Sequence, residues 1–144
     1  MLALRRACGD WLWEQAFPGA ADQVRHVRSA VRALLDDCCA EEDVVHLLSE
    51  LSANAVVHSR SGRAGGEFIV RLQHAPGDCI WGEVEDAGSE EWDGDLAASA
   101  REQSGLFIVM TLASACGVAD RPGCHRAAWF CVPCQPAPTG DEGR

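Results

Sequence analysis

Residues 41–59 read EEDVVHLLSELSANAVVHS, and this pattern predicts an amphipathic helix. Three acids open the segment, where the positive end of a helix dipole favours negative charge. Apolar residues then recur at three- and four-residue steps, at Val44, Leu48, Leu51 and Ala55. Glu50 and Asn54 are four residues apart and stack on one side of the helix beside that stripe. We therefore expect both side chains to border the core.

The flanking segments predict a second helix and three strands. On the N-terminal side, residues 10–17 indicate a short edge strand before a Pro-Gly turn, and residues 21–39 have the apolar spacing of another helix. On the C-terminal side, residues 68–72 and 79–86 alternate as antiparallel strands around a turn at 76–78. Alternation places Ile80, Gly82, Val84 and Asp86 on one face of the second strand.

The last third of the chain is expected to hold a lid, a helix and a hairpin. Residues 88–103 are acidic and weakly periodic, as in a mobile surface stretch. Ser104 can cap a helix over 105–116 that Gly117 ends, and residues 118–132 resemble a closing hairpin. Together these elements predict an α/β (α+β) fold, a two-layer sandwich with helices on one face of a mostly antiparallel sheet. We expect one domain over residues 1–132 and a disordered tail over 133–144.

Composition excludes several kinds of function. The chain has 144 residues and a formal net charge of -10, which argues against a nucleic-acid partner or an acidic membrane surface. All twelve basic residues are arginine, which excludes a Walker-type phosphate loop and Schiff-base catalysis. No apolar run is long enough for a membrane span, and we expect a cytoplasmic protein whose eight cysteines are mostly reduced.

Three polar side chains and one glycine could build a nucleotide site. The Asn54 amide oxygen suits Mg²⁺, and Glu50 is placed to accept a proton in phosphoryl transfer. Their spacing is equally typical of a solvated helix face. Asp86, if it points into the core layer, needs a donor such as an adenine amino group, and Gly88 would let backbone approach the base. The alternative is that residues 86–88 are only a turn.

The start of the predicted helix at Ser104, Gly105 and Leu106 offers free N–H groups for phosphates in a chain without lysine. An ordinary helix cap would have the same sequence. Phosphates would otherwise be held by metal or arginine.

These pieces resemble a known family in order and spacing. Residues 49–58, SELSANAVVH, look like the N box of GHKL ATPases, particularly the anti-sigma-factor serine/threonine kinases and their actinobacterial relatives. Residues 83–88, EVEDAG, resemble the G1 box, and residues 104–109, SGLFIV, resemble the G2 box. The likeness covers residues 11–132 and includes the closing hairpin. The chain departs from the family where the G1 box continues as SEE instead of Gly-Pro, and where the G2 box keeps one glycine of two.

The resemblance implies a histidine-kinase-like ATPase fold and an ATP-binding regulator of transcription. Asn54 would coordinate Mg²⁺, Glu50 would be the catalytic base, and Asp86 would bind the adenine amino group. Gly88 and Gly105 would shape the pocket. The implied partners are a sigma factor and an antagonist protein that accepts the phosphate. The sequence leaves open whether the chain forms a homodimer.

Two other functions remain. The chain could be an ATP-gated protein-binding regulator that transfers no phosphate. A zinc site is a third reading, because Cys116, Cys124, His125, Cys131 and Cys134 cluster near the C-terminus and two of them form a C-x-x-C.

Overall fold

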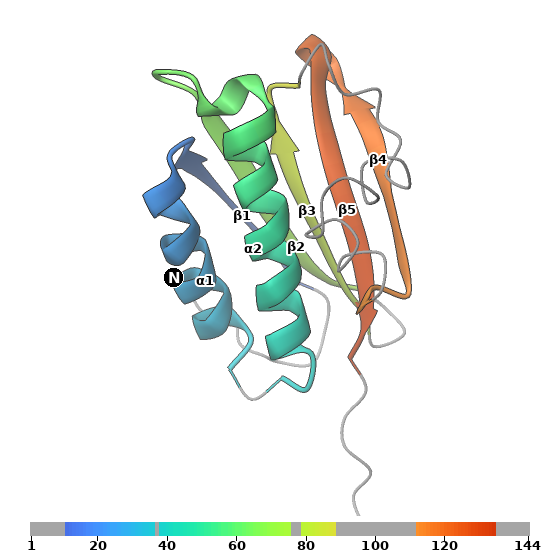
Figure 1. The fold of residues 1–144 in the computed structure, drawn as a ribbon. Coiled ribbons are helices and arrows are strands. Elements are labelled where there is room, and N and C mark those ends of the chain that lie inside the picture. Colours follow the sequence, from blue (N-terminus) through green and yellow to red (C-terminus); the bar gives the residue numbers. More distant parts are fainter. Residues whose placement is uncertain (1–10, 37, 76–78, 89–111, 135–144) are drawn as a thin grey trace, which may run out of the picture.

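Two layers make up the part of the chain that the structure describes, which comprises residues 11–36, 38–75, 79–88 and 112–134 of the computed structural model. A five-stranded sheet forms one layer, and two helices cover one of its faces (Figure 1). This arrangement confirms the predicted α+β sandwich.

The described elements follow one another in an order close to the predicted one. In chain order they are β1 (Trp11–Pro18), the 3-10 turn η1 (Ala21–Gln23), α1 (Val24–Leu34), α2 (Glu41–His58), η2 (Arg60–Gly62), β2 (Glu67–Ala75), β3 (Cys79–Asp86), β4 (Ala115–Arg121), η3 (Pro122–Cys124) and β5 (His125–Pro133). The strands lie in the order β1-β2-β3-β5-β4, and each neighbouring pair is antiparallel. The first and last sheet positions are therefore edges, as expected for β1.

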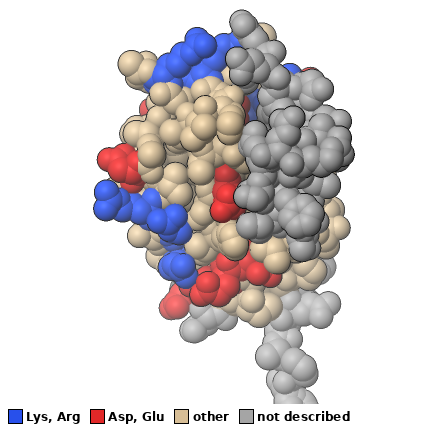
Figure 2. Space-filling model, in the orientation of Figure 1, with Lys and Arg blue, Asp and Glu red and all other residues tan. Residues whose placement is uncertain are grey.

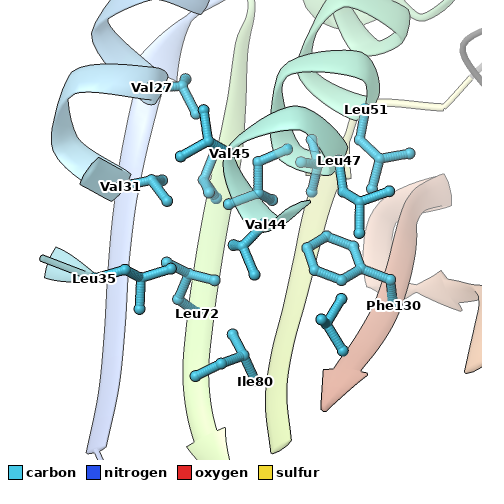
Figure 3. Close-up of a cluster of buried hydrophobic side chains, with 14 of the residues drawn as sticks. Val27, Val31, Leu35, Val44, Val45, Leu47, Leu51, Leu72, Ile80 and Phe130 are labelled. Atoms are coloured by element: carbon cyan, nitrogen blue, oxygen red, sulfur yellow. The ribbon is translucent and has the colours of Figure 1, made fainter. Parts of the chain in front are cut away.

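The core lies between the helices and the sheet. Val27 and Val31 of α1 and Val44, Leu48 and other residues of α2 are fully buried. Figure 3 shows helix side chains meeting those of the strands, including Leu72, Ile80 and Phe130. Gly82 of β3 makes room for the Phe130 ring, because a Cβ there would stand 2.4 Å from the ring's Cζ. Burial of this apolar surface is the main force that holds α2 on β3.

An ion-pair network covers the outer face of the sheet, the face opposite the helices. Glu83 of β3 is only 1% exposed, and both Arg71 and Arg121 donate to its carboxylate. Glu85, two residues along the same strand, accepts from Arg71 at 2.8 Å and pairs with His125 Nδ1 at 2.9 Å. The network links β2, β3, β4 and the start of β5.

Two predicted helix ends are wrong. The helix expected over 21–39 is a 3-10 turn followed by α1, which stops at Leu34. Leu35 and Cys38 keep the apolar spacing because they pack on the core from the connection between the helices.

The helix expected over 105–116 does not reach its predicted end. Ala115 and Cys116 belong to β4, where they pair with Cys131 and Phe130 of β5. Gly117 lies inside that strand against the Trp129 ring instead of ending a helix. Residues 89–111, which hold the predicted lid and the start of this helix, are outside the described residues, as is the turn at 76–78.

Candidate functional site

The polar edge of α2 is placed as the sequence predicts, beside the buried stripe. Asn54 is partly buried, and its Nδ2 atom is buried with no hydrogen-bond partner among the described residues. Since an unpartnered buried N–H group costs free energy, this nitrogen is a donor that the oxygen of a bound ligand would satisfy. Glu50, one turn earlier, keeps 33% of its side chain exposed and lies 3.7 Å from His46 Nε2.

Asp86 is the last residue of β3, and it is partly shielded from solvent. Burial raises the pKa of its carboxyl, although the Gly88 N–H, which donates to Oδ1 at 2.7 Å, lowers it in part. The reading of residues 86–88 as only a turn is contradicted at Asp86, which still pairs with β5. The strand extends to Asp86 opposite Arg126, and the chain then turns through Gly88 at a φ of 79°.

Gly88 is required by two independent constraints. Its positive φ is a conformation that other residues rarely adopt. A Cβ at this position would also stand 2.3 Å from the carbonyl oxygen of Cys124, the last residue of η3. The neighbour that the structure shows at Gly88 is the chain's own Cys124 carbonyl, and the approach of this backbone to a base stays a prediction.

The segment after α2 holds the segment after β3 in place. Ser61, fully buried, accepts from the Ala87 N–H at 2.9 Å, and the Arg60 N–H donates to the Gly88 carbonyl at 2.9 Å. The Arg60 guanidinium also donates to the Ala87 carbonyl at 3.0 Å. Sequence reasoning missed Arg60 and Ser61, because a Ser-Arg-Ser-Gly run reads as an ordinary loop.

These contacts bring the ends of α2 and β3 to the same end of the molecule (Figure 1). Arginines gather there, including Arg60 and Arg63, whereas the acids at residues 41–43 mark the opposite end, where α2 begins. Figure 2 shows basic residues at the end where α2 stops and acids at the end where it begins, with further arginines along the α1 side, of which Arg32 pairs with Glu41 and Glu42. In a chain with a net charge of -10, a basic end is a favourable place for an anion.

The rest of the predicted site is not described. Ser104, Gly105 and Leu106 fall outside the described residues, so the expected phosphate cradle stays a prediction. A separate open groove of about 500 Å³ lies between the start of α1 and the second half of α2. Neither Asn54 nor Asp86 lines it.

Within the described ranges, no group of three or more His, Cys, Asp or Glu side chains is arranged to hold a metal ion. The cysteines of the zinc reading separate instead. Cys131 is joined to Cys79 of the neighbouring strand in a disulfide, which departs from the expectation of reduced thiols for this pair, and Cys134 lies against Cys38. Magnesium differs, since it takes one or two protein oxygens and completes its shell with water and phosphate. The carbonyl oxygen of Asn54 is the atom that could meet that demand, whereas its unpartnered Nδ2 is a donor suited to a phosphate oxygen.

Fold and site together define an α+β domain in which a helix presents an amide and a carboxylate beside a strand that ends in an acid. A family model for the histidine kinase-like ATPase domain matches residues 17–127. The chain therefore belongs to the histidine kinase-like ATPase domain family, a nucleotide-binding class. The resemblance of its sequence motifs to GHKL ATPases is confirmed.

A similar solved structure comprises the RsbU and RsbW domains of Rv1364c from Mycobacterium tuberculosis. It superposes with a TM-score of 0.67 at 19% sequence identity, over 85% of this chain and 32% of that one. At that identity the likeness shows the fold, and the chain spans about a third of the length of this neighbour. No curated protein matches the chain at significant similarity. No helix in the described ranges is long and apolar enough to cross a membrane.

Proposed function

We propose that the protein binds ATP·Mg²⁺ and is a serine/threonine protein kinase of the anti-sigma-factor type. Its substrate would be a small antagonist protein, and its regulatory target a sigma factor in the cytoplasm. The observation that carries the proposal is the buried, unpartnered Nδ2 donor of Asn54, suited to a phosphate oxygen, at the same end of the domain as the burial-shifted carboxyl of Asp86. The fold shared with a chain that contains an RsbW domain supports the class.

Each residue has a role that its position permits. Asn54 would supply a Mg²⁺ ligand, and Asp86 would accept a hydrogen bond from the adenine amino group. Bound magnesium would neutralise phosphate charge during transfer. Glu50 would accept the proton of the attacking hydroxyl, because it is the carboxylate one turn from Asn54. Ser104, Gly105 and Leu106 would offer N–H groups and a surface to the phosphates and base.

A second candidate is an ATP-gated regulator that binds a protein partner and transfers no phosphate. One observation favours it: His46 Nε2 lies 3.7 Å from the Glu50 carboxylate, where it would compete with a substrate hydroxyl for this group. The departures in the G1 and G2 motifs are compatible with the same function.

Phosphate transfer separates the two candidates. The full chain is incubated with Mg²⁺ and ATP labelled on the γ-phosphate, together with antagonist-type proteins from the same genome, one at a time. We expect label on a serine or threonine of one of them. Glu50→Gln should abolish the label while the protein still binds nucleotide. The control is Glu42→Gln on the same helix, whose side chain is 83% exposed.

The outcomes are distinct. Label that survives in Glu50→Gln removes this residue as the base. Partner retention that requires ATP, with no label in the parent protein, supports the gated regulator. A chain that binds neither ATP nor ADP refutes both.

A further inference from the structure

Three cysteine sulfurs meet at the end of the molecule opposite the proposed nucleotide site. Cys38 and Cys39 lie in the connection between α1 and α2, and Cys134 follows the last residue of β5 (Figure 1). The Sγ atoms of Cys38 and Cys134 are 2.9 Å apart, and those of Cys39 and Cys134 are 3.9 Å apart. These residues are 96 and 95 positions apart in sequence, so only the fold brings them together.

The two closest thiols are shielded, and the third is not. Cys38 and Cys134 are partly buried and pack on the hydrophobic core, whereas Cys39 is exposed. Burial, together with a hydrogen bond to Cys38, raises the pKa of the Cys134 thiol to about 12. Since the thiolate is the nucleophile in exchange reactions, Cys134 is a poor first point of attack and Cys39 is the accessible one.

We propose that Cys38, Cys39 and Cys134 form a thiol-oxidation site that closes a Cys38–Cys134 disulfide, with a low-molecular-weight disulfide of the glutathione type as the oxidant. The Sγ separation of 2.9 Å carries the inference. It exceeds a disulfide bond of about 2.05 Å by less than the radius of an atom, so closure needs only a small movement of the connection. The site does not depend on the proposed kinase function.

The chemistry is a series of thiol–disulfide exchanges. The Cys39 thiolate attacks one sulfur of the small disulfide RS–SR, whose S–S bond breaks and releases RSH after protonation by water. Cys134 then gives its proton to water, its sulfur attacks Cys39 Sγ and the second RS group leaves as RSH. Finally Cys38 exchanges into the Cys39–Cys134 bond and returns Cys39 as a thiol. In sum, two protein thiols are oxidised by two electrons, and one RS–SR is reduced to two RSH.

Closure would tie the helix layer to the end of β5. The C-x-x-C of the sequence misleads here, because Cys131 pairs with Cys79 of the neighbouring strand, whereas Cys134 lies against the helix connection. We expect the oxidised protein to unfold at a higher urea concentration than the reduced one, because the link restricts the unfolded chain.

Peptide mapping tests the proposal directly. The native full chain is fully reduced, exposed to graded ratios of oxidised to reduced glutathione, alkylated and cleaved after arginine. Because the chain has no lysine, Cys38 and Cys39 fall in the peptide 33–60, Cys134 in 127–144 and Cys79 in 72–101. Because Cys131 and Cys134 share the peptide 127–144, we expect the 33–60/127–144 link within a three-peptide species that also holds 72–101. Fragmentation should place the bonds at Cys38–Cys134 and Cys79–Cys131, with the loss of two titratable thiols beyond those of Cys79 and Cys131.

Variants identify the sulfurs. Cys134→Ser should lose the 33–60/127–144 link and keep the 72–101/127–144 link, which also reports that the variant is folded. Cys39→Ser should form the same final bond severalfold more slowly. Cys124→Ser, which removes another exposed cysteine, should change neither link nor rate. Absence of the 33–60/127–144 link in the folded parent, or its formation only in urea, overturns the proposal. So does stoichiometric zinc that blocks the three thiols.

Discussion

The surroundings of Asp86 disfavour the ionised form of its carboxyl. Its pKa is raised by burial, so the folded chain holds this proton more tightly than the unfolded chain does. The ionised carboxyl therefore lowers the free energy of unfolding at pH values above its folded pKa, and this cost disappears in acid, where the carboxyl is protonated. A residue that costs stability in the unliganded protein is typical of a binding site.

We therefore predict opposite effects of Asp86→Asn on binding and on stability. Nucleotide affinity should fall at least tenfold, which corresponds to about 1.4 kcal/mol, because an amide nitrogen replaces one acceptor oxygen. The free energy of unfolding without nucleotide should stay the same or rise at pH 7, since the Oδ1 contact with the Gly88 N–H can be kept. Titration calorimetry and urea unfolding measure the two quantities. Equal affinity in variant and parent would remove Asp86 from the site.

Gly88→Ala separates close packing from backbone conformation. Gly88 has a φ of 79°, and a Cβ added to it would meet a carbonyl oxygen, whereas Gly65 has a φ of 78° and nothing within 4 Å of the same position. Gly65→Ala should cost about 1–2 kcal/mol of unfolding free energy, from the left-handed conformation alone. Gly88→Ala should cost clearly more and weaken nucleotide binding as well. Equal losses of unfolding free energy in the two variants would show that the Cys124 backbone moves aside at little cost.

For single residues, the sequence predicts the positions of the candidate site residues better than it predicts the contacts that hold the neighbouring segments in place. The spacing of Glu50 and Asn54 and the alternation that ends at Asp86 are local patterns, and all three residues lie where those patterns predict. Ser61 and Arg60 could not be found in the same way. Their contacts with Ala87 and Gly88 join segments about 26 residues apart, and no local pattern encodes them.

Among the elements, β3 carries different kinds of side chain on the two faces of the sheet. Its inner face carries apolar residues, and its outer face carries Glu83 and Glu85. Burial by itself raises the pKa of Glu85, but hydrogen bonds from Arg71 and His125 outweigh it, and the pKa of this carboxyl lies below its ordinary value. A lowered pKa contributes stability that is present above the unfolded value of 4.5 and is lost as the pH falls through the folded value.

Glu85→Gln should accordingly destabilise the protein at neutral pH and matter less in acid. We expect a loss of about 1–2 kcal/mol at pH 7, since hydrogen bonds to charged groups contribute at this level. The difference from the parent should shrink below pH 4.5, where the parent loses the same interaction. Urea unfolding from neutral pH into acid measures it, with Glu67→Gln at the exposed start of β2 as the control. A constant difference across that range would contradict the assignment.

Element boundaries were the weaker part of the sequence prediction, for physical reasons. The apolar period of α1 continues past its end because Leu35 and Cys38 also pack on the core from a turn. Ala115, Cys116 and Gly117 are small residues with little preference of their own, and pairing with β5 decides that they form a strand. The type of each long periodic element, in contrast, is correct for β1, α2, β2, β3 and β5.

For the whole molecule, ligand binding and folding are linked. If ATP·Mg²⁺ binds only the folded chain, a concentration 100 times its Kd should raise the free energy of unfolding by about 2.7 kcal/mol. Asn54→Ala should remove the part of this gain that depends on Mg²⁺ and keep the part that ATP gives alone. Urea unfolding with ATP, with and without Mg²⁺, measures both. An unchanged response to magnesium in the variant would exclude Asn54 as a ligand.

The strand order has a consequence for how such a domain can diverge. Since β3 pairs with β5 and not with β4, residues 89–111 connect a central strand to an edge strand, and none of the described ladder pairs includes them. Substitutions, insertions and deletions in that interval leave every ladder partner in register. Descendants of one ancestor can therefore replace the interval wholesale and inherit an intact scaffold, and departures from family motifs should accumulate there first.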